Sequence, residues 1–229
     1  MTSLQKWGKS VRTTIPVMAG YLVLGAGFGI LLRTRGYGLG WALAMSAFIY
    51  AGSMQYVAID LLTGGASLLM TAVTTLLVNA RHLFYGISML ERYRAAGRYA
   101  PYLIFSLTDE TYSLVAARED LTGAECFCIS LLDQLYWVLG TALGSLAGAY
   151  LDFNTTGIDF SLTALFLTVF TEQWLETKDH APALIGLGVS IVCRLLFGAD
   201  SFLLPTMGGM LCCLLALDAR RTKKGGESV

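Results

Sequence analysis

Long hydrophobic runs dominate the chain, and short polar interruptions divide them into eight candidate membrane segments. A helix needs roughly 20 apolar residues to cross a bilayer, and most of these runs are about that long. The segments cover residues 13–32, 38–62, 66–90, 99–118, 126–150, 160–177, 182–198 and 201–217. The pattern therefore predicts an all-α fold, a polytopic integral membrane helical bundle with about six to eight membrane segments.

Composition supports a membrane-embedded chain, because 55% of the 229 residues are hydrophobic and only 14% are charged. Soluble domains carry about 25% charged residues. The net charge is zero, which gives no indication of nucleic-acid binding. We expect one transmembrane domain at residues 13–217, between cytoplasmic tails at residues 1–12 and 218–229. The first segment is too long for a typical cleaved signal peptide, so we interpret it as a retained helix.

The distribution of basic residues suggests that two segments do not cross the membrane completely. Three clusters stand out: Lys6/Lys9/Arg12, Arg92/Arg94/Arg98 and Arg220/Arg221/Lys223/Lys224. The positive-inside rule places all three in the cytoplasm, which requires an even number of crossings between them. Three candidate segments separate the first two clusters and five separate the last two. The alternative is that the charge rule fails at one loop, and Arg33 and Arg35, which would lie outside, favour that alternative.

Two segments carry residues that suit such an incomplete crossing. Residues 38–62 contain Ala51–Gln55, and residues 99–118 contain the polar stretch Ser106–Glu110. Non-helical backbone at membrane depth is tolerated only where protein or water lines it. Transporters use such breaks to aim helix ends at substrates or coupling ions. The sequence therefore predicts that some segments are broken or re-entrant.

A polar cluster of Asn79, Arg81 and His82 interrupts the apolar segment at residues 66–90. A cation inside a membrane segment costs about 3 kcal/mol or more, so it usually faces a cavity or a partner. On an ideal helix Arg81 points nearly opposite Asn79 and lies beside Tyr85, whereas His82 lies about 60° from Asn79. All three can share one cavity only if the helix unwinds. Otherwise one side serves the site and the other contacts a neighbouring helix.

Two roles stay open for each ionisable residue of this region. Arg81 either binds a substrate carboxylate or pairs with Asp109 or Glu110. His82 exchanges a proton near neutral pH when unperturbed, so it either carries a coupling proton or only makes a hydrogen bond. Asp109 and Glu110 are adjacent within a span and cannot both stay ionised cheaply, which suits proton-coupled transport. Their alternative role is a salt bridge to Arg81, and both roles hold if that bridge breaks during transport.

The stretch from Gly52 to Gln55 combines a helix-weakening glycine with two uncharged hydrogen-bonding side chains, Ser53 and Gln55. Backbone N–H groups at such a place suit a carboxylate, and side-chain oxygens suit an ammonium group, as a zwitterion requires. The alternative is a Gly/Ser helix contact in which Gln55 is bonded internally.

Glycines that recur every four residues, at Gly140, Gly144 and Gly148, indicate close packing between helices, and Gly25 and Gly29 do the same in the first segment.

For Asp133 and Gln134 we favour hydrogen bonds across helices over the lining of a cavity. The five cysteines form no CxxC pair, so no disulfide frame, zinc site or other metal site is expected, and no cofactor. The chain has no Walker motif, so we do not expect it to use ATP directly.

Four stretches carry a resemblance to a known family. Met45–Ser46 with Tyr50–Gln55 is similar to a serine followed by an Ala-Gly-x-x-Gln signature, and Val78–Gly86 to an Asn-x-Arg-His-x-x-Tyr-Gly signature. Thr108–Tyr112 resembles an Asp-Glu-x-Tyr/Phe element, and Gly157–Phe166 a Gly-x-Asp-Phe segment. On these residues the chain resembles AzlC-type branched-chain amino acid permeases, the large subunits of two-component amino acid exporters.

The resemblance implies export of branched-chain or other hydrophobic amino acids. We interpret the chain as a secondary transporter subunit of the bacterial inner membrane, and the carboxyl groups within its spans favour proton coupling. It also implies a small AzlD-type membrane subunit as partner, and a higher oligomer stays open. We expect the substrate to be bound by Gly52, Ser53, Gln55, Asn79, Arg81 and Tyr85, and protons to be coupled by His82, Asp109 and Glu110. We expect no enzymatic activity. Two other classes stay open, a passive small-solute channel and an intramembrane enzyme with Ser53 and His82 as a dyad.

Overall fold

The computed structural model describes residues 3–118, 120–150 and 178–226, together with residues 160, 163–164, 167, 170–171 and 174–175. These residues form helices and short connections, and the chain divides into two compact units, Met1–Leu162 and Thr163–Val229. Three described helices are long and apolar enough to cross a membrane: Trp7–Thr34, Gly123–Tyr150 and Ala181–Gly198. The predicted all-α membrane fold is confirmed. Most of the predicted segment at 160–177, and most of the motif at 157–166, lie outside the described residues.

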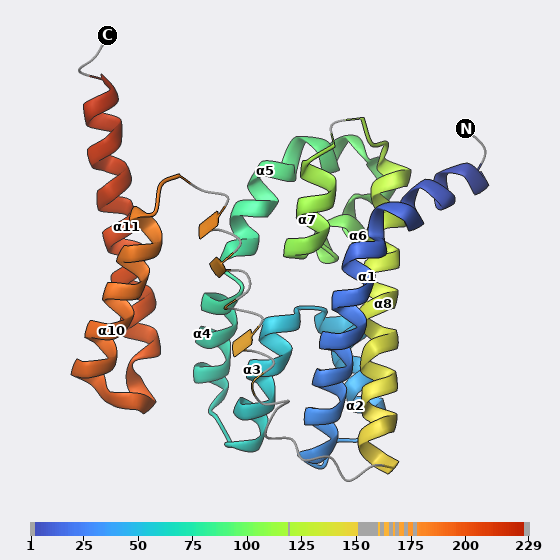
Figure 1. Ribbon diagram of the computed structural model, residues 1–229, viewed down its shortest axis with the longest axis horizontal. Coiled ribbons are helices and arrows are strands. Elements are labelled where there is room, and N and C mark those ends of the chain that lie inside the picture. Colours follow the sequence, from blue (N-terminus) through green and yellow to red (C-terminus); the bar gives the residue numbers. More distant parts are fainter. Residues whose placement is uncertain are drawn as a thin grey trace. The chain divides into compact units, whose positions relative to one another are not determined.

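Two long helices, α1 (Ser3–Thr34) and α8 (Gly123–Tyr150), lie side by side and form the frame of the first unit (Figure 1). They run parallel, because Leu22 contacts Gly140 and, one turn later in each helix, Ala26 contacts Gly144. A Cβ on Gly140 would lie 2.7 Å from the carbonyl oxygen of Leu22. Only glycine allows this approach of the two backbones, so the predicted packing role of the glycines is confirmed.

The predicted interruption of residues 38–62 is confirmed. α2 (Leu39–Ala44) passes into one π-helical turn, η1 (Met45–Ile49), and α3 (Gly52–Thr63) follows after two non-helical residues. Tyr50 has a φ of 43°, in the left-handed region that non-glycine residues rarely adopt. The next residue, Ala51, is close to extended, with φ −133° and ψ 87°. The helix therefore ends at the stretch where the sequence placed the break.

The predicted interruption of residues 99–118 is also confirmed. A short 3₁₀ turn, η2 (Gly97–Tyr99), leads into α6 (Ala100–Phe105), and α7 (Asp109–Ala116) follows after three residues. Thr108 caps α7, because its hydroxyl accepts a hydrogen bond of 3.3 Å from the backbone N–H of Thr111. Threonine at this position satisfies one of the free N–H groups of the first turn.

A third break divides the segment at 66–90, where the sequence left open a continuous helix or local unwinding. α4 (Leu68–Val78) ends before Asn79, and α5 (Arg81–Ala95) begins two residues later. Asn79 has a ψ of 3°, outside the helical range. The backbone N–H of His82 then bonds the carbonyl of Asn79 at 2.9 Å, three residues back. The unwound alternative is therefore the one found.

The two interrupted segments approach the middle of the first unit from opposite ends (Figure 1). α2 and α3 lie in the half at the C-terminal end of α1, whereas α6 and α7 lie in the half at its N-terminal end. Both segments contact Gln134, near the middle of α8. Its Nε2 donates to the carbonyl of Ala47 at 3.0 Å, and its Oε1 accepts from the hydroxyl of Tyr102 at 2.6 Å. Each of these segments is therefore a broken helical segment, and the expected hydrogen bonding of Gln134 across helices is confirmed.

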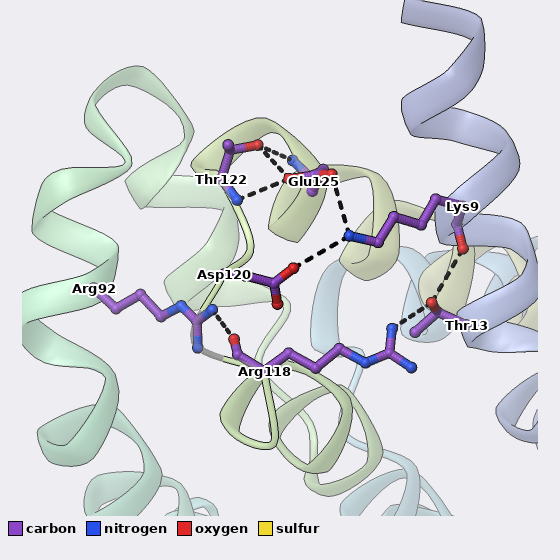
Figure 2. A network of polar contacts seen from close by, with 7 residues as sticks. All are labelled: Lys9, Thr13, Arg92, Arg118, Asp120, Thr122 and Glu125. Atoms are coloured by element: carbon purple, nitrogen blue, oxygen red, sulfur yellow. Dashed lines mark hydrogen bonds and ion pairs between the residues drawn. The ribbon is translucent and has the colours of Figure 1, made fainter. Parts of the chain in front are cut away.

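Polar contacts join α1, α5 and the α7–α8 connection at the N-terminal end of α1 (Figure 2). The ammonium of Lys9 lies 3.3 Å from Oδ2 of Asp120. The guanidinium of Arg92 donates to the carbonyl oxygen of Arg118, whose own guanidinium donates to the hydroxyl of Thr13. Lys9 and Arg92 belong to the first two basic clusters. These clusters therefore lie at the same end of the first unit, as the positive-inside argument requires.

The second unit contains two antiparallel helices, α10 (Ala181–Ser201) and α11 (Leu203–Gly226). They pack through glycines: Gly209 lies against Val189, and Gly186 lies against Met210. Gly198 has a φ of 75° and kinks the end of α10, a conformation that glycine adopts without steric cost.

Candidate functional site

Three helix starts meet at the centre of the first unit through the side chains of Ser53, Arg81 and Asp109. Each residue lies in the first turn of a helix that follows a break: α3, α5 and α7, respectively. Arg81 forms an ion pair with Asp109, from Nη1 to Oδ2. Its Nη2 donates to the hydroxyl of Ser53 at 2.7 Å. We call these residues the Arg81 triad, and the pairing alternative for Arg81 is the one found, with Asp109 as the partner.

The two charged residues of the triad lie in unequally favourable electrostatic environments. The first turn of a helix presents free N–H groups and carries partial positive charge. Asp109 is stabilised at such a place, whereas Arg81, at the start of α5, is not. Arg81 therefore depends on Asp109 and Ser53 for compensation. Its side chain is 33% exposed and that of Asp109 is 26% exposed, so water screens the pair only partly.

Asn79 and His82, at the break between α4 and α5, line a cavity of about 380 Å³. Its wall is mainly apolar and includes Ile49, Leu90, Ile104, Phe105 and Leu107. Tyr50 and Ala51, from the break before α3, also line it. The Oδ1 atom of Asn79 is buried and has no hydrogen-bond partner among the described residues. The chain thus places an unused acceptor beside an apolar cavity, and Arg81 is not among the residues that line it.

Tyr85 contacts both α7, which begins at Asp109 of the Arg81 triad, and His82, which lines the cavity. Its ring stacks on that of Tyr112, with centroids 4.5 Å apart, and meets the ring of His82 edge to face at 5.9 Å. The Nδ1 atom of His82 lies 3.2 Å from the carbonyl oxygen of Asn79. The aromatic contacts hold α5 against α7 beside the triad.

Gln55 is fully buried, and both its amide oxygen and its amide nitrogen form hydrogen bonds inside the protein. Its Oε1 accepts from the indole N–H of Trp137 at 2.9 Å, and its Nε2 donates to the hydroxyl of Ser46 at 3.1 Å. The Ser46 hydroxyl in turn donates to Thr141 at 2.9 Å. Gly52 lies against the same indole ring, where a Cβ would be 3.0 Å from Cη2. Gln55 and Gly52 therefore fix the start of α3 against α8, which matches the internal-bonding alternative.

Glu110 does not join the ion pair of its neighbour Asp109. Its Oε2 accepts a hydrogen bond of 2.7 Å from the hydroxyl of Tyr21 on α1. Sequence reasoning missed Tyr21, because a tyrosine in an apolar first helix carries no signal of a partner 89 residues away. It missed Trp137 for the same reason, since that contact spans 82 residues.

Within the described part of the chain, no three His, Cys, Asp or Glu side chains are grouped as a metal site would require. The cysteines of the described residues form no disulfide with one another; Cys126, Cys128 and Cys193 are buried, and Cys212 and Cys213 are exposed.

Residues 16–151 match the model of a protein family described as AzlC protein. The chain is 45% identical over 209 residues to the branched-chain amino acid transport protein AzlC of Bacillus subtilis, covering 89% of this chain and 82% of that protein. It is 43% identical over 206 residues to an uncharacterized membrane protein of Helicobacter pylori, covering 88% and 90%. It is 27% identical over 222 residues to the inner membrane protein YgaZ of Escherichia coli, covering 90% and 87%. No solved structure matches the chain at a significant level.

Proposed function

We propose, because this chain belongs to the AzlC protein family, that it exports branched-chain or other hydrophobic amino acids across a bacterial inner membrane, coupled to protons. The observation that carries this proposal is the apolar cavity beside Asn79, next to a charge pair at three helix starts. The relative from Bacillus subtilis is named for branched-chain amino acid transport, which supports the substrate class.

The cavity suits one small, largely apolar molecule. Ligand pockets have volumes of about 300–1,000 Å³, and the cavity of about 380 Å³ lies at the lower end of this range. Its aliphatic and aromatic wall accepts a branched side chain. In this proposal Asn79, which lines the cavity, accepts from the substrate ammonium group through its unpartnered Oδ1. The N–H groups of Gly52 and Ser53, directly after the lining residue Ala51, donate to the substrate carboxylate.

The Arg81 triad is proposed as the switch of the transport cycle. A substrate carboxylate that attracts Arg81 competes with Asp109, and breaking their pair releases the starts of α5 and α7 from each other. Asp109, Glu110 and His82 are then placed to bind and release the coupling proton. Gln55 acts through the position of α3, and Tyr85 through its stacking on α7.

The geometry supports transport over peptide hydrolysis. A serine–histidine dyad needs the two side chains within about 3 Å of each other. The Ser53 hydroxyl accepts from Arg81, whereas the His82 ring contacts the Asn79 carbonyl and the Tyr85 ring.

We further propose that the end of the first unit with Lys9 and Arg92 faces the cytoplasm, as do residues 1–12 and 218–229. Residues 13–217 are the transmembrane domain in this proposal. A small AzlD-type membrane subunit completes the exporter, and any higher oligomer is built from that pair.

Counterflow in proteoliposomes tests the proposal. The full chain, with its small membrane subunit, is reconstituted and loaded with unlabelled amino acids, and entry of labelled leucine, valine, alanine and glutamate is followed with and without a pH gradient. We expect saturable counterflow of leucine and valine that responds to the gradient, and none of glutamate. Linear flux that ignores the gradient would instead indicate a passive channel, and no flux would overturn the proposal.

A further inference from the structure

A continuous chain of hydrogen bonds connects two carboxyl groups in the middle of the first unit. From Glu110 it runs to the hydroxyl of Tyr21 at 2.7 Å, and from there to the hydroxyl of Thr108 at 2.7 Å. It continues to the hydroxyl of Thr111 at 3.1 Å and ends at Oδ2 of Asp133, 2.9 Å further on. The chain therefore links α1, α7 and α8 through three hydroxyl groups, and we call it the hydroxyl chain.

The number of protons in the hydroxyl chain decides the charge at its ends. Four oxygen–oxygen contacts join its five side chains, and each hydrogen bond needs one proton between its two oxygens. A hydroxyl group has one proton to donate, whereas an ionised carboxylate has none. The three hydroxyls thus supply three protons for four contacts. One carboxyl must contribute the fourth.

Without a fourth proton, the contact between the hydroxyls of Tyr21 and Thr108 would have no hydrogen to share. If both carboxylates are ionised, Tyr21 donates to Glu110, Thr111 donates to Asp133 and Thr108 donates to Thr111. The two oxygens of Tyr21 and Thr108, 2.7 Å apart, then face each other with no proton between them. This arrangement is repulsive, because two lone pairs meet at hydrogen-bond distance.

Burial adds to this requirement. Asp133, Thr111 and Thr108 are buried, and Asp133 has 0% exposure. Among the described residues, neither Asp133 nor Glu110 forms an ion pair with a cation. An unpaired buried charge is costly, and with both carboxyls ionised Asp133 would carry one in the same hydrogen-bonded chain as a second charge on the half-buried Glu110.

We propose that Glu110 and Asp133 share one proton through the hydroxyl chain, so that Asp133 is a second proton site of the transporter. The role of this shared proton in transport rests on the proposed proton coupling, whereas the hydrogen bonds that hold the proton do not depend on it. With the proton on Asp133, each hydroxyl donates toward Glu110, which is ionised. With the proton on Glu110, all three hydroxyls donate toward Asp133. In the concerted step the proton of Asp133 passes to Thr111, while the protons of Thr111, Thr108 and Tyr21 pass to Thr108, Tyr21 and Glu110, respectively. Four O–H bonds break and four form, so the number of protons is conserved.

Neighbouring charges connect the hydroxyl chain, which acts as a proton relay, to the Arg81 triad. The ionisable groups that face its two ends are Arg81 on α5, Asp109 on α7, Tyr50 before α3 and Tyr102 on α6. While Arg81 pairs with Asp109, its positive charge counteracts the negative charge of Asp109 beside Glu110, and so keeps more of the shared proton on Asp133 than an unpaired Asp109 would. If a substrate carboxylate draws Arg81 away, Asp109 is left as an unpaired anion beside Glu110. The proton then moves to Glu110, next to the opened triad.

Infrared spectroscopy of the purified full chain in lipid vesicles tests the shared proton without any transport. The C=O stretch of a protonated carboxyl group is followed at neutral pH in the wild type and in Glu110→Gln and Asp133→Asn. Each amide supplies the fourth proton itself, from its NH₂ group, and lets the remaining carboxyl ionise. We expect one carboxylic acid band in the wild type and complete loss of this band in each single variant.

Two variants of Thr111 provide the matched control. Thr111→Ser keeps the hydroxyl, so Glu110→Gln in that background should still remove the band. Thr111→Val breaks the hydroxyl chain, so Glu110→Gln should no longer remove the band of Asp133. Absence of the band in the wild type, or its persistence in either single amide variant, would overturn the relay. Failure of amino acid counterflow with the expected band pattern would reject the transport proposal and leave the shared proton standing.

Discussion

Arg81 and Asp109 are the first residues of two different helices, α5 and α7, and their side chains form an ion pair between the two helix starts. A cation is unfavourable at the positive end of a helix, and an anion is favourable there. The pair at the centre of the first unit therefore joins Arg81, whose charge is disfavoured by its own helix, to Asp109, whose charge is favoured by its own helix. This asymmetry suits a switch, because Arg81 gains from any second anion that approaches.

Removing either charge should destabilise the protein. We expect Arg81→Gln and Asp109→Asn each to lower the free energy of unfolding by about 1–3 kcal/mol, less than the roughly 3–5 kcal/mol of a fully buried pair. The double variant should recover part of this loss, since no charge is left unpaired, but should not recover transport. Thermal unfolding in detergent and counterflow in proteoliposomes measure the two effects.

The exposed cation of Arg98, which bonds only its neighbour Tyr99 in the described structure, provides the control for this pair. Arg98→Gln should leave both stability and counterflow close to the wild type. Single variants of Arg81 and Asp109 that unfold like the wild type would contradict the ion pair.

Trp137 should support the start of α3 through its indole N–H. We expect Trp137→Phe to lower the free energy of unfolding by about 1–3 kcal/mol, because the buried Oε1 of Gln55 loses its donor. Trp41→Phe is the matched control, since Trp41 is 61% exposed and should change stability by at most about 0.5 kcal/mol. Equal unfolding temperatures for the two variants would show that the Gln55 contact contributes nothing.

The sequence predicted those features that local residue types determine. The breaks at Ala51 and at Ser106–Thr108 could be located because glycine and polar residues interrupt apolar runs. The break after Asn79 stayed an alternative, because the residues before it favour a helix and nothing local decides where the chain unwinds. The hydrogen bonds of Glu110 and Gln55 could not be predicted, since their partners are 89 and 82 residues away.

Acid should weaken the contact between Lys9 and Asp120 at the end of the first unit (Figure 2). The hydrogen bond from Lys9 lowers the pKa of Asp120 below its ordinary value of 3.8. A carboxyl with a lowered pKa stabilises the folded chain at pH values above the ordinary pKa, and this contribution is lost as the pH falls through the lowered pKa.

We therefore expect the unfolding temperature of the wild type to fall more steeply below about pH 4 than that of Asp120→Asn. The difference should be small, because Lys9 and Asp120 are 43% and 71% exposed. Asp60→Asn removes another exposed carboxylate and should keep the wild-type profile. Identical acid profiles for the wild type and Asp120→Asn would mean that the contact does not contribute to stability.

Gly86 should set the size of the side chain that the cavity accepts. It lines the cavity from α5, and a Cβ built on it meets no heavy atom within 4 Å. An added methyl group at this position therefore has open space around it, and we expect larger side chains there to take up cavity volume. Because glycine is about 1 kcal/mol less favourable than alanine inside a helix, Gly86→Ala should not destabilise the protein.

We expect Gly86→Ala and, more strongly, Gly86→Val to lower leucine counterflow about tenfold relative to alanine, since one methylene in a fitted pocket changes binding by about 1–3 kcal/mol. Gly20→Ala is the matched control, because a Cβ on Gly20 also meets no heavy atom within 4 Å and Gly20 does not line the cavity. It should leave the leucine-to-alanine ratio unchanged. If Gly86→Val keeps the wild-type ratio while it still transports, the substrate side chain does not occupy this cavity.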